Sequence, residues 1–405
     1  MKWYEDVLRE GEQNPNVILS KSQKAELIPK IIDAGADAVV LMPAVHFTEE
    51  QLVKELCDGP YRDRICVTTM LRESQFKQAK YIGATRLIPF APVSDRMIKY
   101  MGVDRDSHLK KVKNKLKTAY DMGFRLDFAA LDAPNGNLDY EIGFFKEIGS
   151  YIRGGTILPC DTVGGTDPDS YEMFISEIVK NAPDGVNIGV HCHNDRGMAN
   201  KNTVAGVNSG ATVVDTSIGG LGDRAGNADT EEVLFALKEE GIVLPGVKYE
   251  KLHELSNEVC LAAGREGKPA KPAEVGSPEA FYTIAGIHAW ILEQSRKFKE
   301  PSPFLAREYG QKDVVLLGKT MGNSNIRYYE DELKPLVGEL TALKCTYLRD
   351  QIKTLSIAQK RPYTIDEIKY LLKKGILIAH LNNLEAQKIK VTSVEEVDQS
   401  YHRPW

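Results

Sequence analysis

Two histidines separated by a single residue, His191 and His193, end a short apolar run that covers residues 186–193. The run predicts a buried β-strand. Because side chains alternate along a strand, both imidazoles lie on one face, while Cys192 points to the other face and is expected to pack. Neutral imidazoles bind divalent transition metals. An isolated pair of this kind is as often structural as metal-binding, so the groups around it decide its interpretation.

Other polar residues follow strands that would flank this one. Glu10 lies in segment 8–13 after the first predicted strand, and Asn227 lies in the glycine-rich loop after a strand predicted at 212–217. If the strands close into a barrel, the seventh, eighth and first are neighbours, and functional groups gather at their carboxyl ends. The candidate ligands of one divalent ion are then Glu10, His191, His193 and Asn227. With one carboxylate among them, the ion would keep positive charge and attract an anionic, chelating substrate.

The elements that must position these groups alternate with a period of about 30 residues through the first ~240 residues. Amphipathic stretches at 22–34, 109–122 and 169–181 predict helices, with Ser20 and Asp169 as N-caps. The strands are predicted to end near Leu8, Met42, Thr69, Phe90, Ala130, Cys160, His191 and Ser217. This alternation matches an α/β fold of the (β/α)8 TIM-barrel type. A doubly wound sheet is the structural alternative, but the convergence of the candidate ligands favours the barrel.

The chain has 405 residues, more than one hydrophobic core usually organises, so a large domain with an appendage is expected. The net charge is −5 and no long run of like charges is present, so the sequence does not indicate a basic surface for binding nucleic acid or an anionic membrane. No apolar run reaches the ~20 residues of a transmembrane helix, and the N-terminus is too charged for a signal peptide, so we expect a cytoplasmic protein. Six cysteines without C-x-x-C spacing predict reduced thiols.

Four segments together carry a specific resemblance to a known family. They are LREGEQ at 8–13, DTVGGTDP at 161–168, HCHND at 191–195 and GGLGDRAGNADTEEV at 219–233. They resemble the DRE-TIM metallolyase superfamily, and within it the Claisen-condensing branch of homocitrate synthases and 2-isopropylmalate synthases. The resemblance implies a TIM barrel and a metal-dependent reaction of acetyl-CoA, or another acyl-CoA, with a 2-oxo acid. Asp223 and Arg224 occupy the loop region in which 3-hydroxy-3-methylglutaryl-CoA lyases carry a catalytic cysteine, which favours condensation over cleavage.

The resemblance also implies roles for single residues. The expected metal ligands are Glu10, His191, His193 and, as a weaker or water-linked ligand, Asn227. The ion would be zinc, manganese or magnesium. Arg9 would polarise the substrate carbonyl, and Gln13 and Thr162 would face the substrate. Glu12 is expected to brace the loop that carries these residues.

A further part of the resemblance lies downstream of the barrel. Segment 276–288 ends in the Gly-Ile-His (GIH) motif with which the synthases reach an active site across the dimer interface. His288 is therefore expected to help with proton transfer when the methyl group of the acyl-CoA becomes an enolate. The alternative is a structural histidine at a helix start. We predict a homodimer whose chain contains a catalytic barrel domain at 1–265, a subdomain with the GIH motif at 266–340, and a small helical subdomain at 341–405.

The expected substrate pocket departs from the family pattern. Val40 and Leu131 stand where the synthases carry carboxylates, and Asn135 replaces an arginine, whereas Asp132 remains and is expected to face the substrate. Losing charge-assisted hydrogen bonds of about 1.5–3 kcal/mol each predicts an acceptor other than 2-oxoglutarate or 2-oxoisovalerate. Arg72 is a candidate for binding a distal carboxylate or another anion. A metal-dependent carbon–carbon lyase or aldolase, and a regulatory homologue without turnover, remain as alternatives.

Overall fold

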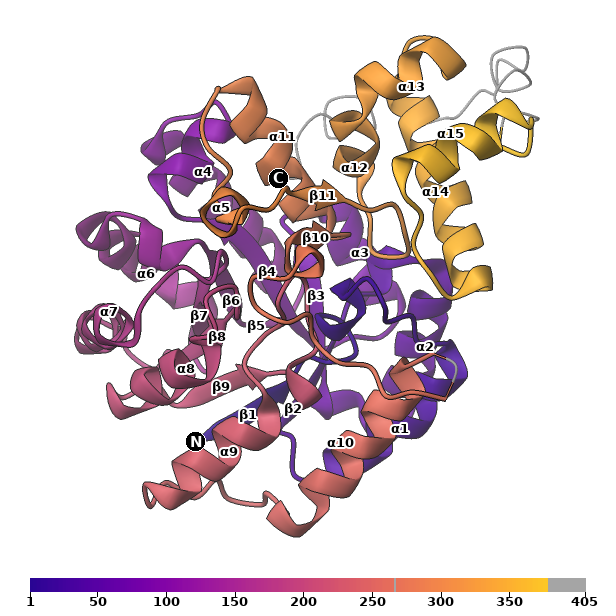
Figure 1. The fold of residues 1–405 in the computed structure, drawn as a ribbon. Coiled ribbons are helices and arrows are strands. Elements are labelled where there is room, and N and C mark those ends of the chain that lie inside the picture. Colours follow the sequence, from indigo (N-terminus) through magenta and orange to yellow (C-terminus); the bar gives the residue numbers. More distant parts are fainter. Residues whose placement is uncertain (266, 378–405) are drawn as a thin grey trace.

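A closed barrel of parallel strands occupies the first part of the chain (Figure 1). The computed structural model describes residues 1–265 and 267–377. The strands are β1 (Lys2–Glu5), β2 (Ala38–Leu41), β3 (Ile65–Met70), β4 (Arg86–Pro92), β5 (Arg125–Leu126), β6 (Phe128–Leu131), β7 (Thr156–Asp161), β8 (Asn187–Cys192) and β9 (Val213–Thr216). β5 and β6 both pair with β4 and share one position, and pairing of β1 with both β2 and β9 closes the ring. The predicted (β/α)8 barrel is confirmed, and the open doubly wound sheet is excluded.

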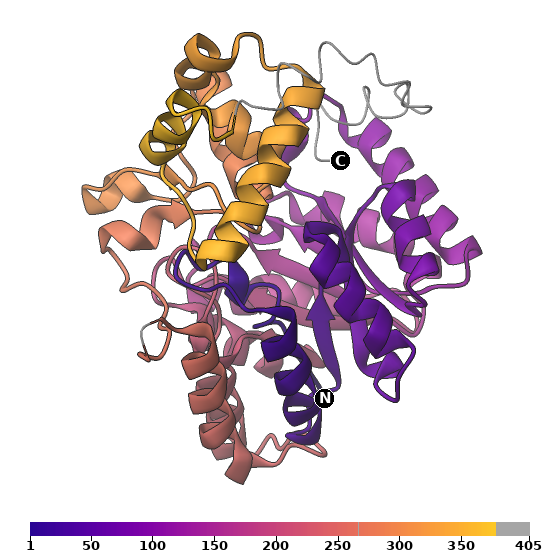
Figure 2. The ribbon, with the colours of Figure 1, turned by 90° about the vertical axis from the view of Figure 1, so that its right-hand side faces the viewer.

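Helices alternate with the strands and surround them (Figure 2). They are α1 (Lys21–Asp33), α2 (Phe47–Cys57), α3 (Glu73–Tyr81), α4 (Asp95–Tyr100), α5 (Arg105–Asp121), α6 (Leu138–Ile152), α7 (Pro168–Lys180), α8 (Ala199–Asn208), α9 (Thr230–Glu239) and α10 (Tyr249–Ala263). Ser20 caps α1 as predicted, in a reciprocal capping box with Gln23. At α7 the predicted cap Asp169 is wrong. Asp167 is the cap, because Pro168 directly after it fits the first helical position.

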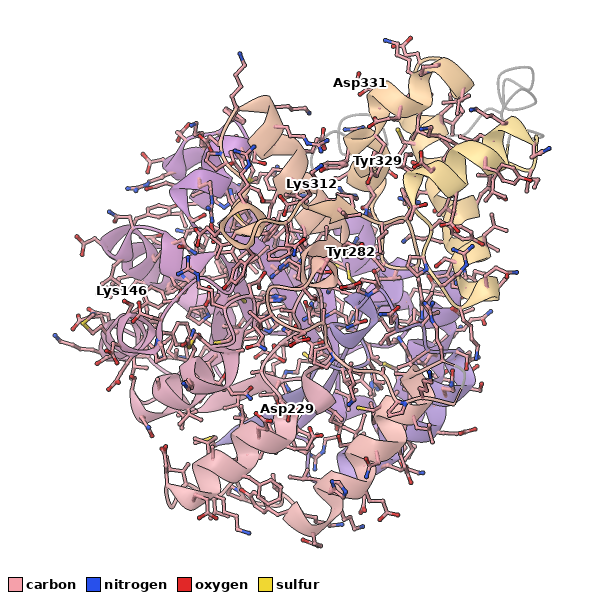
Figure 3. The ribbon with its side chains drawn as sticks, viewed as in Figure 1. Lys146, Asp229, Tyr282, Lys312, Tyr329 and Asp331 are labelled. Atoms are coloured by element: carbon pink, nitrogen blue, oxygen red, sulfur yellow. The ribbon has the colours of Figure 1, made fainter. Side chains whose placement is uncertain are left out.

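Apolar side chains fill the barrel as well as the layer between strands and helices. The interior cluster consists of Tyr4, Ala38, Val40, Cys66, Ile88, Leu158, Cys160 and Val213. Val40 therefore belongs to the packed interior of the barrel. All six cysteines are free thiols, and Cys192 is buried in the outer core, as predicted. Charged side chains such as those of Lys146 and Asp331 are exposed on the outer helices (Figure 3).

A mainly helical region follows the barrel and packs on one side of it (Figures 1 and 2). Its elements are β10 (Tyr282–Thr283), α11 (Gly286–Lys297), β11 (Val314–Val315), α12 (Asn323–Tyr328), α13 (Glu330–Val337), α14 (Ala342–Gln359) and α15 (Ile365–Lys373). Its hydrophobic core also takes in Met97 and Tyr100 of α4 and Val163 after β7, so it shares an apolar interface with the barrel. Residue 266 and residues 378–405, which belong to the predicted GIH-motif and C-terminal subdomains, lie outside the described residues.

Within residues 1–265 and 267–377, no helix is both long enough and apolar enough to cross a membrane.

Candidate active site

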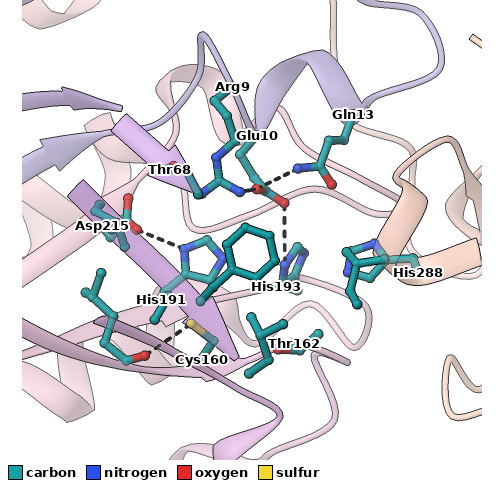
Figure 4. Close-up of a pocket in the computed structure, with 16 residues that line it drawn as sticks. Arg9, Glu10, Gln13, Thr68, Cys160, Thr162, His191, His193, Asp215 and His288 are labelled. Carbon is teal, nitrogen blue, oxygen red and sulfur yellow. Dashed lines mark hydrogen bonds and ion pairs between the residues drawn. The ribbon is translucent and has the colours of Figure 1, made fainter. Parts of the chain in front are cut away.

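A cavity of about 70 Å³ lies at the carboxyl ends of the barrel strands (Figure 4). Strands contribute Thr68, Ile88, Phe90, Ala129, Leu131, Leu158, Cys160, His191 and Asp215 to its wall. Arg9, Glu10 and Gln13 enter from the segment after β1, and His288 enters from α11. Functional groups of TIM barrels gather at this end, because the loops that follow the strands meet there.

Three of the predicted metal ligands meet in this cavity. Glu10, His191 and His193 are buried, and one candidate ligand atom of each lies within 4.8 Å of the others. His193 Nε2 is 3.6 Å from Glu10 Oε1. His191 Nδ1 lies 3.1 Å from Asp215 Oδ2, which leaves Nε2 available to a ligand. These separations are compatible with donor atoms that each lie about 2.0–2.2 Å from one ion.

The fourth predicted ligand, Asn227, borders the same group. Its backbone bridges that of His193, and its Nδ2 lies 3.5 Å from His191 Nε2. Within the described part of the chain, Asn227 Oδ1 and His193 Nδ1 are buried without a hydrogen-bond partner. A buried polar atom left unpaired costs about 1–3 kcal/mol unless a ligand, ion or water satisfies it. The donor set therefore fits a divalent cation, with Asn227 suited to a weaker or water-linked position.

The charge environment of the two histidines differs. Burial, together with the positive charge of Arg224, lowers the pKa of His193 well below its usual value, so this imidazole is neutral near pH 7, the form that binds metals. Burial also acts to lower the pKa of His191, but the hydrogen bond and charge of Asp215 outweigh it and the pKa is raised. A bound cation would compete with the proton on His191, which makes occupancy depend on pH.

Arg9 and Gln13 surround the carboxylate of Glu10. Arg9 forms ion pairs with both Asp6 and Glu10, and its Nε donates to Asp6 Oδ1 at 2.9 Å. Gln13 Nε2 donates to Glu10 Oε2 at 2.8 Å. Sequence reasoning did not identify Asp6 or Asp215 as partners in the site. Both carboxylates stand at or just beyond the end of a barrel strand, which is the signal that could have revealed them.

His288 reaches the cavity from the start of α11 and is held by an acid. Its Nδ1 lies 2.5 Å from Asp223 Oδ2, and Thr283 Oγ1 donates to the same carboxylate oxygen. Arg224 Nη1 lies 2.9 Å from the same His288 nitrogen. The ring centroid of His288 is 5.6 Å from that of His193. Asp223 and Arg224 thus fix the orientation of an imidazole that stands next to the candidate ligands.

Arg224 connects three loops beneath His288. Its Nε and Nη2 donate to the two oxygens of Asp195 at 2.6 and 2.9 Å, and Nη2 also donates to the Thr162 carbonyl at 2.9 Å. The guanidinium carbon lies 4.5 Å from the centre of the Phe304 ring. Burial acts to lower the pKa of Arg224, but the charge of Asp195 outweighs it and the pKa is raised, so the side chain stays cationic.

The predicted substrate residues occupy different places. Thr162 lines the cavity, and its Oγ1 accepts a hydrogen bond from the backbone N–H of Asp132. The Asp132 carboxylate does not line the cavity, because it is bound by Ser94 Oγ at 2.6 Å and by Arg96 at 2.8 Å. Arg72 lines a second, adjacent cavity.

The GIH motif lies at the cavity of its own chain. In the structure of the single chain, His288 contacts Asp223 and Arg224 of the same chain. Crossing of segment 266–340 between subunits stays a prediction.

Comparison with known proteins places the chain in a family. The sequence model of the HMGL-like family matches residues 1–259. The chain belongs to the HMGL-like family. Homocitrate synthase AksA of Methanopyrus kandleri is 32% identical over 82% of this chain and 82% of that protein. The 2-isopropylmalate synthase of Methanocaldococcus jannaschii is 32% identical over 83% of this chain and 64% of that protein. Both are named synthases, so the predicted resemblance to the homocitrate and 2-isopropylmalate synthase group of the HMGL-like family is confirmed.

The barrel also resembles a solved hydroxymethylglutaryl-CoA lyase structure. Hydroxymethylglutaryl-CoA lyase from Pseudomonas aeruginosa matches with a TM-score of 0.56 and 20% sequence identity, over 69% of this chain and 95% of that chain. This likeness shows the shared TIM-barrel fold.

Proposed function

We propose that the protein catalyses the condensation of acetyl-CoA with a 2-oxo acid, giving a 2-hydroxy-2-carboxymethyl acid and CoA. The observation that carries the proposal is the convergence of Glu10, His191 and His193 beside Arg9 in one buried cavity of an HMGL-like barrel. The names of the relatives, homocitrate synthase and 2-isopropylmalate synthase, support this class of reaction.

Glu10, His191 and His193 would hold a divalent ion, with Asn227 as the weaker ligand. When bound, the ion would supply Lewis-acid polarisation of the acceptor carbonyl and a template for a chelating 2-oxo acid. Zinc, manganese and magnesium all suit a shell of mixed nitrogen and oxygen donors. Arg9, held by Asp6 and Glu10, presents a fixed positive charge to the carbonyl oxygen of the acceptor.

His288 would act on the other substrate. It takes a proton from the methyl group of acetyl-CoA, and Asp223, 2.5 Å from Nδ1, orients the ring and stabilises the imidazolium that forms. The resulting carbon nucleophile bonds to the keto carbon of the acceptor, whose oxygen gains a proton and becomes a hydroxyl. Water then cleaves the thioester, and release of the CoA thiol makes the sequence irreversible.

The wall of the cavity predicts its acceptor. Leu131, at one position that holds a carboxylate in the synthases, lines the cavity together with Ile88, Phe90 and Ala129. Val40 lies in the barrel interior and does not line it, so the specificity argument rests on Leu131 alone. We propose an acceptor with an apolar group at this wall, and poor use of 2-oxoglutarate, whose distal carboxylate would lie against it. Poor use of 2-oxoisovalerate does not follow from an apolar wall and stays a prediction from the departures of the sequence from the family pattern.

The domain division 1–265, 266–340 and 341–405 and the homodimer are part of the same proposal. Sedimentation of the purified protein tests the assembly. A fully active monomer would contradict the crossing of the GIH motif between subunits.

Release of free thiol from acetyl-CoA, measured with a panel of 2-oxo acids, tests the reaction. Mass spectrometry of the acid product shows whether the acetyl carbons are attached to the acceptor. We expect thiol release that requires both an acceptor and a divalent ion. Cleavage of the product thioester without any condensation would favour the lyase alternative, and metal binding without turnover of any substrate would favour the regulatory homologue.

A further inference from the structure

A second cavity, of about 180 Å³, adjoins the candidate active site. The two cavities share Arg9, Gln13, Phe90 and Ile287, so they lie side by side at the segment after β1. The far wall is supplied by α14 of the C-terminal region, which contributes Arg349 and Lys353. A substrate whose one end is bound at Arg9 can therefore contact the C-terminal region with its other end.

The lining of this second cavity is cationic. It includes Arg9, Arg72, Arg349 and Lys353, and no carboxylate side chain is among the residues that line it. Arg9 is committed to Asp6 and Glu10. Arg349 bonds Asp350, whose side chain is half exposed to solvent. The charge of the far wall is thus not cancelled within the cavity, which favours an anionic occupant.

Lys353 is the most constrained of these groups. It is buried, and its Nζ donates to the Val45 carbonyl at 2.7 Å. Burial lowers its pKa to about 7, with the charge of Arg349 as a further cause, while Asp350 acts in the opposite direction. The buried carboxylate of Glu49 forms ion pairs with Lys24 and Lys319. A buried ammonium with a carbonyl as its hydrogen-bond partner is costly, and an anion in the cavity would offset that cost.

We propose that the second cavity binds the anionic end of a substrate, with Arg349 and Lys353 holding its oxygen atoms. The inference rests on the proposed condensation and names the part of the site that recognises charge. Two sources supply such a group: a distal carboxylate on the acceptor, or a phosphate of CoA. In both, α14 of the C-terminal region takes part directly in substrate binding.

Two variants and a matched control test this assignment. Lys353→Met removes the charge and keeps most of the unbranched side chain. Arg349→Met removes the guanidinium group at a partly exposed position, with a shorter side chain in its place. Lys373→Met removes an exposed charge from the neighbouring α15 and is the control. Lys353→Met should unfold at the same or a higher temperature than wild type, because it removes a costly buried charge.

Steady-state kinetics with paired substrates distinguish a distal carboxylate of the acceptor from a phosphate of CoA. Acceptors are compared in pairs of equal length, 2-oxoglutarate with 2-oxopentanoate and 2-oxoadipate with 2-oxohexanoate, and acetyl-CoA is compared with acetyl-pantetheine. Each variant should lose about 10–100-fold in kcat/KM for the anionic member of one comparison and change little for its uncharged member. Loss confined to the dicarboxylates identifies the carboxylate, and loss confined to acetyl-CoA identifies the phosphate. Equal loss for all substrates, or no loss for any, overturns the proposal.

A binding measurement keeps this test separate from the proposed reaction. Calorimetric titration of wild type and Lys353→Met with CoA and with 2-oxoadipate requires no turnover. If wild type releases no thiol, the proposed function fails, while tighter binding of either probe by wild type than by the variant still supports the anion site. Equal affinity of both proteins for both probes refutes the anion site, whatever the kinetics show.

Discussion

Lys319 is predicted to hold the loop that carries the active-site residues. It belongs to a buried group of two lysines and two glutamates, formed by Lys24, Lys319, Glu12 and Glu49. Lys319 Nζ lies 2.7 Å from Glu12 and 2.8 Å from Glu49, and Lys24 Nζ lies 2.5 Å and 2.7 Å from the same two acids. The four charges balance. Glu12 is two residues from Glu10, so the group ties the C-terminal region to the loop after β1, as the bracing role predicted for Glu12 requires.

Replacing Lys319 with Met should destabilise the protein strongly. Two buried carboxylates would then share the single ammonium of Lys24, and removal of one partner from a buried ion pair costs about 3–5 kcal/mol. At about 2 °C per kcal/mol for a chain of this length, the melting temperature should fall by about 6–10 °C. Calorimetry and urea unfolding measure the change. Lys334→Met, at an exposed position on α13, is the control and should change stability by less than about 0.5 kcal/mol.

A second substitution checks that the loss comes from unbalanced charge. Glu49→Gln in the Lys319→Met background removes one of the two carboxylates and should recover at least about 1 kcal/mol. A loss below about 1 kcal/mol for Lys319→Met, or a double variant less stable than the single one, would refute this reasoning.

Three further predictions concern other parts of the molecule. Asp223→Asn should lower kcat about 10²-fold or more with metal content unchanged, because His288 loses the acid that orients it; steady-state kinetics and metal analysis check this, and an unchanged kcat would exclude the role. Leu131→Glu should raise kcat/KM for 2-oxoglutarate relative to apolar acceptors, and wild-type use of 2-oxoglutarate above ~10⁴ M⁻¹s⁻¹ would show that the apolar wall is neutral. Burial, followed by the charge of Asp132, raises the pKa of Glu141 to about 9, so this carboxyl stays protonated in the folded protein while the unfolded chain ionises. The free energy of unfolding should therefore fall as pH rises from about 4.5 to 9, by up to about 3 kcal/mol at pH 7, and Glu141→Gln should flatten this dependence in urea titrations; an unchanged pH dependence would argue against it.

The barrel was predictable from the sequence because parallel strands buried on both faces give apolar runs at regular spacing. The same rule brought Glu10, His191 and His193 to one place, since closure makes their strands neighbours. The cap of α7 was misplaced by two residues, because local residue types alone do not distinguish two nearby aspartates.

Contacts between distant segments could not be predicted in this way. Asp223 and His288 are 65 residues apart, and no local spacing indicates which barrel loop α11 packs against. Lys353 likewise enters the neighbourhood of the active site only through the packing of the C-terminal region on the barrel. The position of Val40 was misjudged for a related reason. The tilt of a strand within the barrel decides which of its residues reaches the cavity and which packs in the interior below it. Val40 packs in the interior.

The metal content of purified protein tests the central claim most directly. We expect about one divalent ion per chain in wild type and in His253→Ala, which alters an exposed histidine of α10. His191→Ala and His193→Ala should each hold far less than one ion per chain, because each loses one of three converging ligands. Full occupancy in both of these variants would contradict the assignment of Glu10, His191 and His193 as the metal site.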